Sequence, residues 1–192
     1  MIINIYITLM PVILAGICNM IFVKTSLYKR LYSPIDGGIC LKDGYRLFGE
    51  NKSWGGFFSM VFFSMCIQVL WGLLCHSKSY MQMSNYLYVY NKNTVGFNIF
   101  IGSLFGLAYM ICELPNSFIK RRFNIRPGKT EKGIRGFFFL LDQFDSLFGV
   151  IFILALVYPM DIVTYCFFVC LGGMTHVVIN LILYGLKIRK NI

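Results

Sequence analysis

Residues 146–186 read SLFGVIFILALVYPMDIVTYCFFVCLGGMTHVVINLILYGL, and Asp161 is the only Asp, Glu, Lys or Arg among them. A helix that crosses a hydrocarbon layer of ~30 Å needs about 20 residues, so this run is too long for one span. Pro159 has no backbone N–H to donate and, together with Asp161, interrupts the run. We therefore expect two membrane helices, at about 146–158 and 162–186.

The rest of the chain has the same character. Of its 192 residues, 57% are hydrophobic and 14% are charged, whereas about a quarter of the residues of a soluble domain are charged. Further apolar segments lie at about 3–23, 55–75 and 95–115. The helix of 95–115 can continue into the basic run beyond it, and the segment at 146–158 can extend backwards through 137–141. The sequence predicts an all-α, polytopic integral membrane protein, with about five transmembrane helices in one membrane domain that spans the chain.

The basic residues give an independent test of this count. Lys and Arg number six in residues 24–54, two in 76–94, seven in 116–141, none in 158–161 and three in the C-terminal tail. This alternation is what the positive-inside rule requires of five helices. We expect a multi-pass protein of the cell membrane with its N-terminus outside, its C-terminus and active site cytoplasmic, and its two large loops, 24–54 and 116–141, on the cytoplasmic side.

The net charge of +10 could otherwise suggest a nucleic-acid partner. The aromatic residues, however, lie in the apolar runs rather than among the basic residues, and the positive-inside excess accounts for the charge. We therefore expect no nucleic-acid binding. The seven cysteines are scattered and include no Cys-x-x-Cys pair, which argues against a disulfide framework and against a zinc site.

The loop at 24–54 combines glycines with charged residues. It contains KDGYRLFGENKSW, which includes Asp43, Arg46, Lys52 and Ser53. Glycine lets backbone N–H groups approach phosphate oxygens, and Lys and Arg neutralise the phosphate charge. The alternative is a Gly-rich surface loop with an ordinary excess of positive charge, and the spacing alone favours neither.

Glu113 lies at the end of the third apolar segment. A charged side chain within a membrane costs at least ~2.5 kcal/mol unless it is paired or binds a metal, so Glu113 is a functional candidate. On a helix, Glu113 shares one face with Ser117 and with Lys120 or Arg121. The alternative is a purely structural ion pair with Arg or Lys.

Asp142 and Asp145 are spaced i, i+3 at the entrance to the fourth segment, so they face the same way on a helix. Two such carboxylates repel one another unless a cation lies between them. Mg²⁺ favours one or two carboxylates together with phosphate oxygens and waters. With Glu113, these acids among Lys and Arg residues suit a metal–polyphosphate complex in which an in-line displacement takes place.

His176 and Asn180 are spaced i, i+4 in the fifth segment. Polar residues within an apolar membrane helix usually face the interior of the bundle. Contact with a substrate and hydrogen bonding between helices both remain open for this pair.

Several motifs follow one another along the chain: Pro11-Val12 with Asn19, Pro34-Ile35-Asp36, Asp43-Gly44 with Arg46, Phe48-Gly49, Lys52-Ser53-Trp54, Ser117 to Arg122, Pro127-Gly128, Leu141-Asp142-Gln143 with Asp145, and Thr175-His176 with Asn180. In this order they resemble the membrane cytidylyltransferases that make CDP-activated lipids, and most closely the CDP-archaeol synthase family. The Leu-Asp-Gln form, in place of Leu-Asp-Arg, favours the archaeol branch over the CDP-diacylglycerol branch.

This resemblance implies that CTP and a lipid glycerol phosphate, archaeol-type or diacyl, give a CDP-lipid and pyrophosphate in phospholipid biosynthesis, with Mg²⁺ as cofactor. Catalysis would then be mainly positioning and charge neutralisation. The implied metal ligands are Glu113, Asp142 and Asp145. The implied catalytic residues are Asp142, Asp145 and Lys120, and the implied substrate-binding residues are Lys52, Ser53, Asp43, Arg46, Ser117, Arg121, Arg122, His176 and Asn180.

The chain departs from the family pattern in two places. Cys112-Glu113-Leu114 stands where the family usually has Gly-Asp-Leu, which moves the carboxylate outward by one methylene, and Gly55 follows Lys-Ser-Trp where Arg or Glu is expected. A CTP-dependent lipid kinase of the polyprenol type and an inactive membrane homologue are the alternatives. A transporter is disfavoured because the charges do not gather at the midplane. A homodimer is a further expectation.

Overall fold

The computed structural model describes residues 1–125 and 135–185, so the Pro127-Gly128 motif and the C-terminal tail lie outside the described residues. Within these ranges the chain is helical, with two isolated β-bridges and no strand. Five helices are long and apolar enough to cross a membrane, which confirms the all-α class and the five-helix count. They are α1 (Ile2–Phe22), α3 (Trp54–Ser77), α5 (Val95–Arg122), α6 (Arg135–Val157) and α7 (Ile162–Gly185). The connections contain the short helices α2 (Ser26–Leu31) and α4 (Ser79–Ser84) and the 3₁₀ helix η1 (Tyr86–Tyr88).

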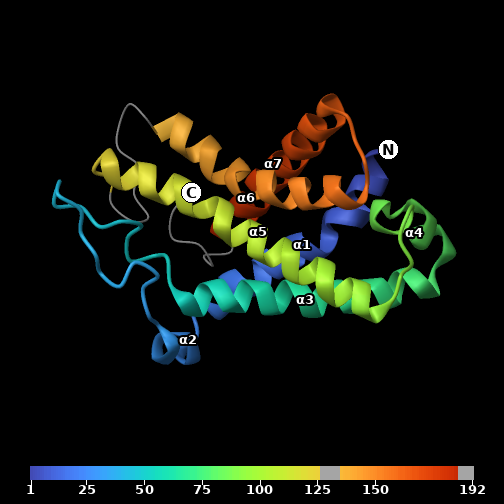
Figure 1. Ribbon diagram of the computed structural model, residues 1–192, viewed down its shortest axis with the longest axis horizontal. Coiled ribbons are helices and arrows are strands. Elements are labelled where there is room, and N and C mark those ends of the chain that lie inside the picture. The colour runs from blue at the N-terminus through green and yellow to red at the C-terminus, as the bar shows by residue number, and fades with distance from the viewer. Residues whose placement is uncertain (126–134, 186–192) are drawn as a thin grey trace.

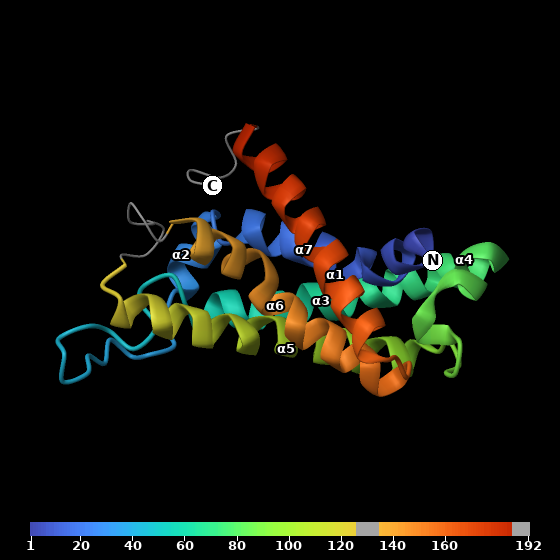
Figure 2. The same cartoon turned by 90° about the horizontal axis from the view of Figure 1, so that it is seen from above.

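Helix α5 lies at the centre of the bundle. It runs beside α3 and packs on another side against α6, while α1 packs against α3 (Figure 1). Helix α7 packs mainly against α6 and diverges from the other helices towards its C-terminal end (Figure 2). The loop 33–53, between α2 and α3, lies at one end of the bundle, and α4 lies at the opposite end (Figure 1).

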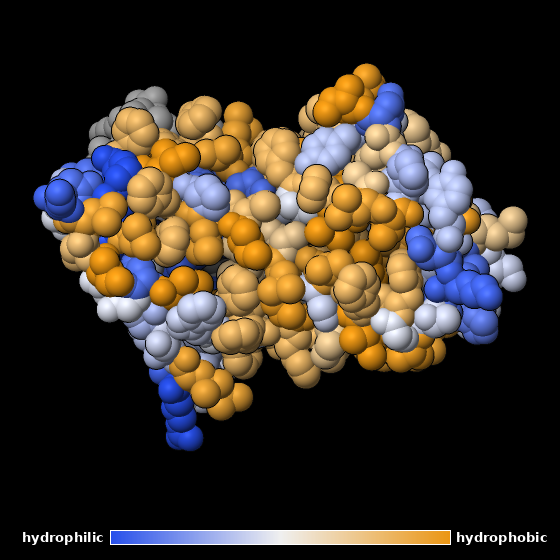
Figure 3. All heavy atoms as spheres, viewed as in Figure 1, coloured by the Kyte–Doolittle hydropathy of each residue, from blue (hydrophilic) through white to orange (hydrophobic). Residues whose placement is uncertain are grey.

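Polar and apolar side chains are distributed as expected for a protein in a bilayer. Apolar side chains cover the middle of the face in Figure 3, and hydrophilic side chains gather at its two ends. Large apolar side chains such as Phe58 and Leu70 are more than half exposed, whereas Gln68 and Asn98 are buried. Gln68 Nε2 donates to Asn98 Oδ1 (3.0 Å). Within hydrocarbon, polar side chains can form hydrogen bonds only with one another, so they face the interior of the bundle.

The last apolar run is divided as predicted, because α6 ends and α7 begins on either side of Pro159 and Asp161. The Asp161 carboxylate accepts a hydrogen bond from a backbone N–H in the first turn of α7 (3.1 Å). Two helices extend beyond their apolar segments, in the directions that the sequence allowed. Helix α5 continues to Arg122 and α6 begins at Arg135, so much of the loop expected at 116–141 is helical.

Two glycines set the spacing of the central helices. A Cβ atom on Gly106 of α5 would lie 2.6 Å from the Cα atom of Val61 in α3, and one on Gly149 of α6 would lie 2.7 Å from the carbonyl oxygen of Ala108 in α5. Both distances are far shorter than van der Waals contact. Glycine therefore allows α5 to approach both neighbours closely, and the polar residues at one end of α5 and α6 come within hydrogen-bonding distance.

Candidate active site

Two carboxylates of α6 and one amide of α5 meet at the end of the bundle that carries the loop 33–53. Asn116 Nδ2 donates to Asp142 Oδ1 (2.6 Å) and to Asp145 Oδ2 (2.7 Å). Asn116 is 5% exposed, and its Oδ1 atom has no hydrogen-bond partner among the described residues. The amide therefore holds together two carboxylates that would otherwise repel one another.

Lys120 approaches the same pair from the next turn of α5. Its ammonium group donates to both oxygens of Asp142, and the ring of Phe138 lies 5.8 Å from Nζ. The Lys120 side chain is 12% exposed, so this ion pair is partly shielded from water. The amide of Asn116 thus lies between the two carboxylates, and the ammonium group of Lys120 binds one of them, Asp142.

Lys52 forms a second ion pair, with Glu113 of α5. The Lys52 carbonyl oxygen accepts a hydrogen bond from the N–H of Ile35 (2.9 Å), which fixes the backbone of Lys52 just before α3. Burial acts to lower the pKa of Lys52, but the nearby charge of Glu113 outweighs it and raises the pKa, so the ammonium group stays protonated. Lys52 also interacts electrostatically with Asp145 and Asp142, so both ion pairs belong to one group of charges.

We call six side chains the charged cluster: Lys52, Glu113, Asn116, Lys120, Asp142 and Asp145. Its three carboxylates outnumber its two ammonium groups, so a polyphosphate would be repelled unless a cation joins them. The atoms of the cluster that could ligate a cation are oxygens, which Mg²⁺ prefers. One of them, a buried amide oxygen, has no hydrogen-bond partner among the described residues. The residues present therefore fit a divalent cation. No three Asp, Glu, His or Cys side chains within 1–125 and 135–185 are grouped to hold a metal by themselves, so other oxygen ligands would be needed.

Asp36 organises the loop 33–53, which carries Lys52. Its buried carboxylate accepts hydrogen bonds from Arg46 Nη2 (2.5 Å) and from three backbone N–H groups of the loop (3.0–3.1 Å). Burial acts to raise the pKa of Asp36, but these hydrogen bonds outweigh it and hold the pKa well below its usual value. These N–H groups of the glycine-containing loop therefore bind a carboxylate of the chain itself.

The two arginines at the end of α5 bind different segments, and only Arg122 donates to the loop 33–53. Arg122 donates to Asp43 Oδ2 (2.6 Å) and to the carbonyl oxygen of Arg46 (2.6 Å). Arg121 is buried and donates to the carbonyl oxygen of Ile125. Four residues expected at the substrate site are thus engaged within the chain: Asp43, Arg46, Arg121 and Arg122. Arg122 fastens the loop to α5, whereas Arg46 binds Asp36 within the loop.

Ser53 begins α3 and supports Lys52. Its Oγ atom accepts a hydrogen bond from the N–H of Gly56 (3.1 Å) and lies 2.6 Å from the hydroxyl oxygen of Tyr28. Such a cap satisfies a backbone donor of the first helical turn, so Ser53 fixes the position of its neighbour Lys52. Ser117 follows Asn116 on α5 and is half-buried.

Helix α7 contributes two of the predicted residues, and both link helices. Asn180 Nδ2 donates to Gln143 Oε1 (2.5 Å), and His176 Nε2 lies 3.3 Å from the hydroxyl oxygen of Tyr109 in α5. Gln143 directly follows Asp142, so Asn180 joins α7 to the part of α6 that carries the aspartates. The structure shows the hydrogen bonds between helices that were one of the two alternatives for this pair.

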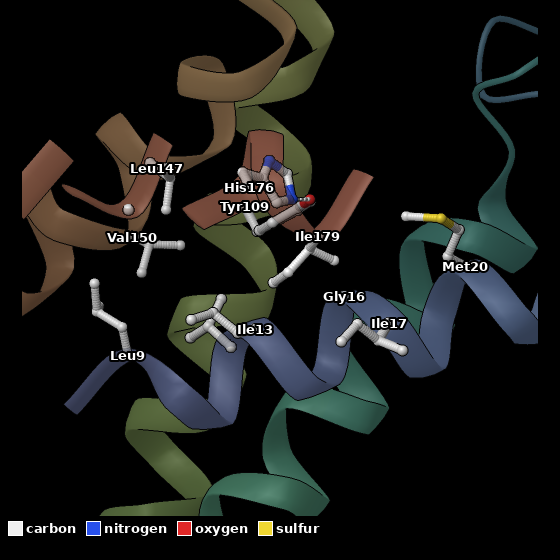
Figure 4. A pocket seen from close by; sticks show the side chains of 12 residues that line it. Leu9, Ile13, Gly16, Ile17, Met20, Tyr109, Leu147, Val150, His176 and Ile179 are labelled. Atoms are coloured by element: carbon white, nitrogen blue, oxygen red, sulfur yellow. Dashed lines mark hydrogen bonds between the residues drawn. The ribbon is translucent and has the colours of Figure 1, made fainter. Parts of the chain in front are cut away.

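An apolar pocket lies between α1, α5, α6 and α7, beside His176 (Figure 4). Its empty space of about 490 Å³ includes solvent outside the bundle, so the pocket is a partly open groove rather than a closed cavity. The lining residues are Leu9, Val12, Ile13, Gly16, Ile17, Met20, Tyr109, Leu147, Val150, Gly172, His176 and Ile179. Since only Tyr109 and His176 bring polar groups to it, the pocket suits a hydrocarbon group.

A family model described as CarS-like, CDP-archaeol synthase, matches residues 1–192. This chain belongs to the CDP-archaeol synthase family. It is 30% identical to the CDP-archaeol synthase of Methanococcus aeolicus, over 98% of this chain and 95% of the relative. It is 28% identical to that of Methanocaldococcus jannaschii, over 82% of this chain and 81% of the relative.

The fold has a counterpart among solved structures. One that is reported as structural insight into an intramembrane enzyme for archaeal membrane lipids biosynthesis superposes with a TM-score of 0.65. It is 21% identical and covers 94% of this chain and 95% of its own. The five-helix arrangement of this CDP-archaeol synthase family member is therefore that of a known membrane-enzyme fold.

Two polar residues of the site were not predicted from the sequence. Asn116 and Gln143 are uncharged amides, a residue type that carries no chemical signature of a catalytic or metal site. A signal for Asn116 exists, because it shares a helical face with Glu113 and Lys120 at spacings of three and four residues. The same reasoning would have singled out Asn116 if polar residues had been weighed with the charged ones.

Proposed function

We propose that this member of the CDP-archaeol synthase family transfers CMP from CTP to an archaeol-type lipid glycerol phosphate, with Mg²⁺ as cofactor, and releases a CDP-lipid and pyrophosphate. The observation that carries this proposal is the family match over residues 1–192, which includes every residue of the charged cluster. The geometry supports it, because the cluster lies at one end of a membrane bundle, where a lipid phosphate and a water-soluble nucleotide can meet.

The reaction itself is a phosphoryl displacement. An oxygen of the lipid phosphate forms a bond to the α-phosphorus of CTP as the bond from that phosphorus to the oxygen bridging to the β-phosphorus breaks. Pyrophosphate leaves with the electron pair of that bond. The attacking oxygen already carries negative charge at neutral pH, so no side chain has to remove a proton from it. The protein then contributes position and charge, and well-oriented reactants can be worth about 7–11 kcal/mol of the barrier.

Lys52 and Lys120 are the side chains of the cluster that would neutralise phosphate oxygens. Asp142, Asp145 and further oxygen donors of the cluster would hold Mg²⁺, which supplies Lewis-acid stabilisation of the charge on the transferred group. Lys120, which donates to both oxygens of Asp142, lies beside the site that would hold the cation and would be within reach of a phosphate oxygen there. Lys52 remains held near the site by Glu113 and by the backbone of the loop 33–53.

The lipid and the charged cluster each have a place in the bundle. The apolar pocket between α1, α5, α6 and α7 suits a hydrocarbon chain of the lipid, since almost all of its lining is apolar. The alternation of basic residues supports a cytoplasmic charged cluster, with the N-terminus outside the cell and the C-terminus in the cytoplasm.

The expected homodimer stays a prediction, and chemical crosslinking in native membranes tests it.

The experiment combines purified protein, labelled CTP, Mg²⁺ and a panel of lipid phosphates that includes archaeol phosphate and phosphatidic acid. We expect a labelled CDP-lipid and pyrophosphate with archaeol phosphate. Asp142→Asn should lower the rate by at least roughly 10²-fold, because it removes charge at the cation site. Asp161→Asn makes the same change in the turn before α7, away from the cluster, and should leave the rate unchanged.

Each other outcome changes a different part of the proposal. CDP together with a phosphorylated lipid alcohol would identify a CTP-dependent kinase, because a kinase transfers the γ-phosphate and retains no nucleotide on the lipid. A clear preference for phosphatidic acid would overturn the acceptor. If no product forms where another member of the family is active, the chain is an inactive homologue.

A further inference from the structure

The amide of Asn116 is satisfied on one side only. Its Nδ2 atom donates to Asp142 and Asp145, while its Oδ1 atom is buried without a partner among the described residues. A buried acceptor that is left unsatisfied is destabilising. The Oδ1 atom therefore lies beside two carboxylates and is available to accept a hydrogen bond or to coordinate a cation.

A change of partner is open to this side chain without any movement of the backbone. A half-turn about the Cβ–Cγ bond exchanges Oδ1 and Nδ2, and this torsion is broad and roughly two-fold in Asn. The N–H side faces the carboxylates when they are the only partners, because a donor has to lie between two acceptors. When Asp142 and Asp145 share a divalent cation, the same place favours an acceptor, and Oδ1 can turn towards it.

Glu113, the third ligand implied by the resemblance, is engaged elsewhere. It forms an ion pair with Lys52, and the two side chains are 21% and 17% exposed, respectively. Separating a shielded ion pair and leaving one charge uncompensated is destabilising. Asn116 carries no charge, so it has no ion pair to separate when it turns its oxygen towards the aspartates.

We propose that Asn116 is a ligand of the divalent cation through Oδ1, alongside Asp142 and Asp145, and that Glu113 positions Lys52. The inference rests on the proposed function for the presence of a cation, and it goes beyond that function by assigning the ligands. It replaces the set Glu113, Asp142 and Asp145 with one that contains a neutral amide.

Metal binding is measured directly on the full chain in nanodiscs without substrate, with Mn²⁺ as the probe and the electron paramagnetic resonance signal of free Mn²⁺ as the readout. Asn116→Leu keeps the volume of the side chain and removes its oxygen, so the Kd for Mn²⁺ should rise by at least about tenfold. Asn116→Asp keeps an oxygen and should bind at least as tightly as the wild type. Asn4→Leu makes the matched change at the opposite end of the bundle and should bind Mn²⁺ normally. Equal Mn²⁺ affinity in Asn116→Leu and the wild type would overturn the proposal.

A cysteine variant distinguishes a ligand from a residue that only steadies the aspartates. Thiolate ligands prefer soft metals, so Asn116→Cys should favour Cd²⁺ over Mn²⁺ and show a Cd²⁺–thiolate charge-transfer absorption above that of the wild type. Ser117→Cys places the thiol one residue further along α5 and should not. Equal Cd²⁺ absorption in the two variants would refute Asn116 as a ligand, even if Asn116→Leu does not fold. Neither readout depends on product, so a wild-type chain that binds Mn²⁺ through Asn116 but forms no CDP-lipid contradicts only the proposed function.

Discussion

Replacement of Asp36 by Asn should loosen the loop 33–53 and leave the helical bundle folded. The Asp36 side chain is fully buried, with 0% exposure. Four donors converge on its two oxygens: Arg46 Nη2 and the backbone N–H groups of Gly38, Phe48 and Gly49. Asn keeps one oxygen but places an NH₂ group where the other accepted hydrogen bonds, and it removes the charge opposite Arg46. The substitution therefore creates a donor–donor conflict and leaves Arg46 with only the exposed carboxylate of Glu50, 3.8 Å away.

The size of the effect follows from the burial of the pair. Removing one partner of a buried ion pair costs about 3–5 kcal/mol. The Arg46 side chain is 24% exposed, so water recovers part of this loss and we expect about 2–4 kcal/mol for the local stability of the loop. Because 1.36 kcal/mol corresponds to a tenfold change, opening of the loop should become roughly 30- to 900-fold more favourable.

Hydrogen–deuterium exchange of the full chain in nanodiscs measures this opening at the amides of Gly38, Phe48 and Gly49, which bind the carboxylate. Asp43→Asn is the matched control in the same loop. The Asp43 side chain is 40% exposed and its ion pair is partly solvated, so its loss should cost at most about 1 kcal/mol and accelerate exchange by less than about sixfold. The reasoning is refuted if exchange in Asp36→Asn is no faster than in Asp43→Asn.

Three further predictions concern pH, the nucleotide and helix packing. The pKa of Asp36 lies below its ordinary value of 3.8. Protection of the loop amides from hydrogen–deuterium exchange should therefore persist from neutral pH down to about 4 and be lost as the pH falls through the lower, folded-state pKa. Amide protection in Asp36→Asn should show no such loss at low pH. Lys52→Met should lower kcat/KM for CTP by roughly 10²–10³-fold in the labelled-CTP assay. Lys29→Met, at an exposed position of α2, should leave kcat/KM unchanged. An equal fall in both variants would contradict the role of Lys52. Gly149→Ala should destabilise the bundle by about 1–3 kcal/mol in thermal unfolding, since its Cβ atom would lie 2.7 Å from a carbonyl oxygen of α5. A Cβ atom at Gly96 would have no atom within 4 Å, so Gly96→Ala is the matched control. Equal melting temperatures in the two variants would contradict the packing argument.

Membrane insertion and helix number could be predicted from the sequence, because both depend on local properties. A run such as 146–186 has to form two spans, since its length exceeds one bilayer and Pro159 interrupts its backbone hydrogen bonding. The shared orientation of Asp142 and Asp145 could also be predicted, because the geometry of a helix places residues i and i+3 on one face. The continuation of α5 into its basic residues was also anticipated, but its end at Arg122 could not be predicted, because its last turns are charged and contact the loop and α6.

The choice of partner for each charged group was decided only by the tertiary structure. Lys52 and Glu113 are 61 residues apart in the chain, and their pairing depends on how the loop 33–53 meets α5. From the sequence alone, the backbone N–H groups around Asp36 would suit a phosphate equally well. The sequence places Asn116 on the helical face of Glu113 and Lys120, but not beside the two aspartates of α6. Ion pairs and hydrogen bonds act over a few ångströms, so their partners depend on the spacing between helices. The sequence by itself determined a five-helix membrane bundle with charges at one end, and the close packing of α3, α5 and α6 determined which of those charges meet.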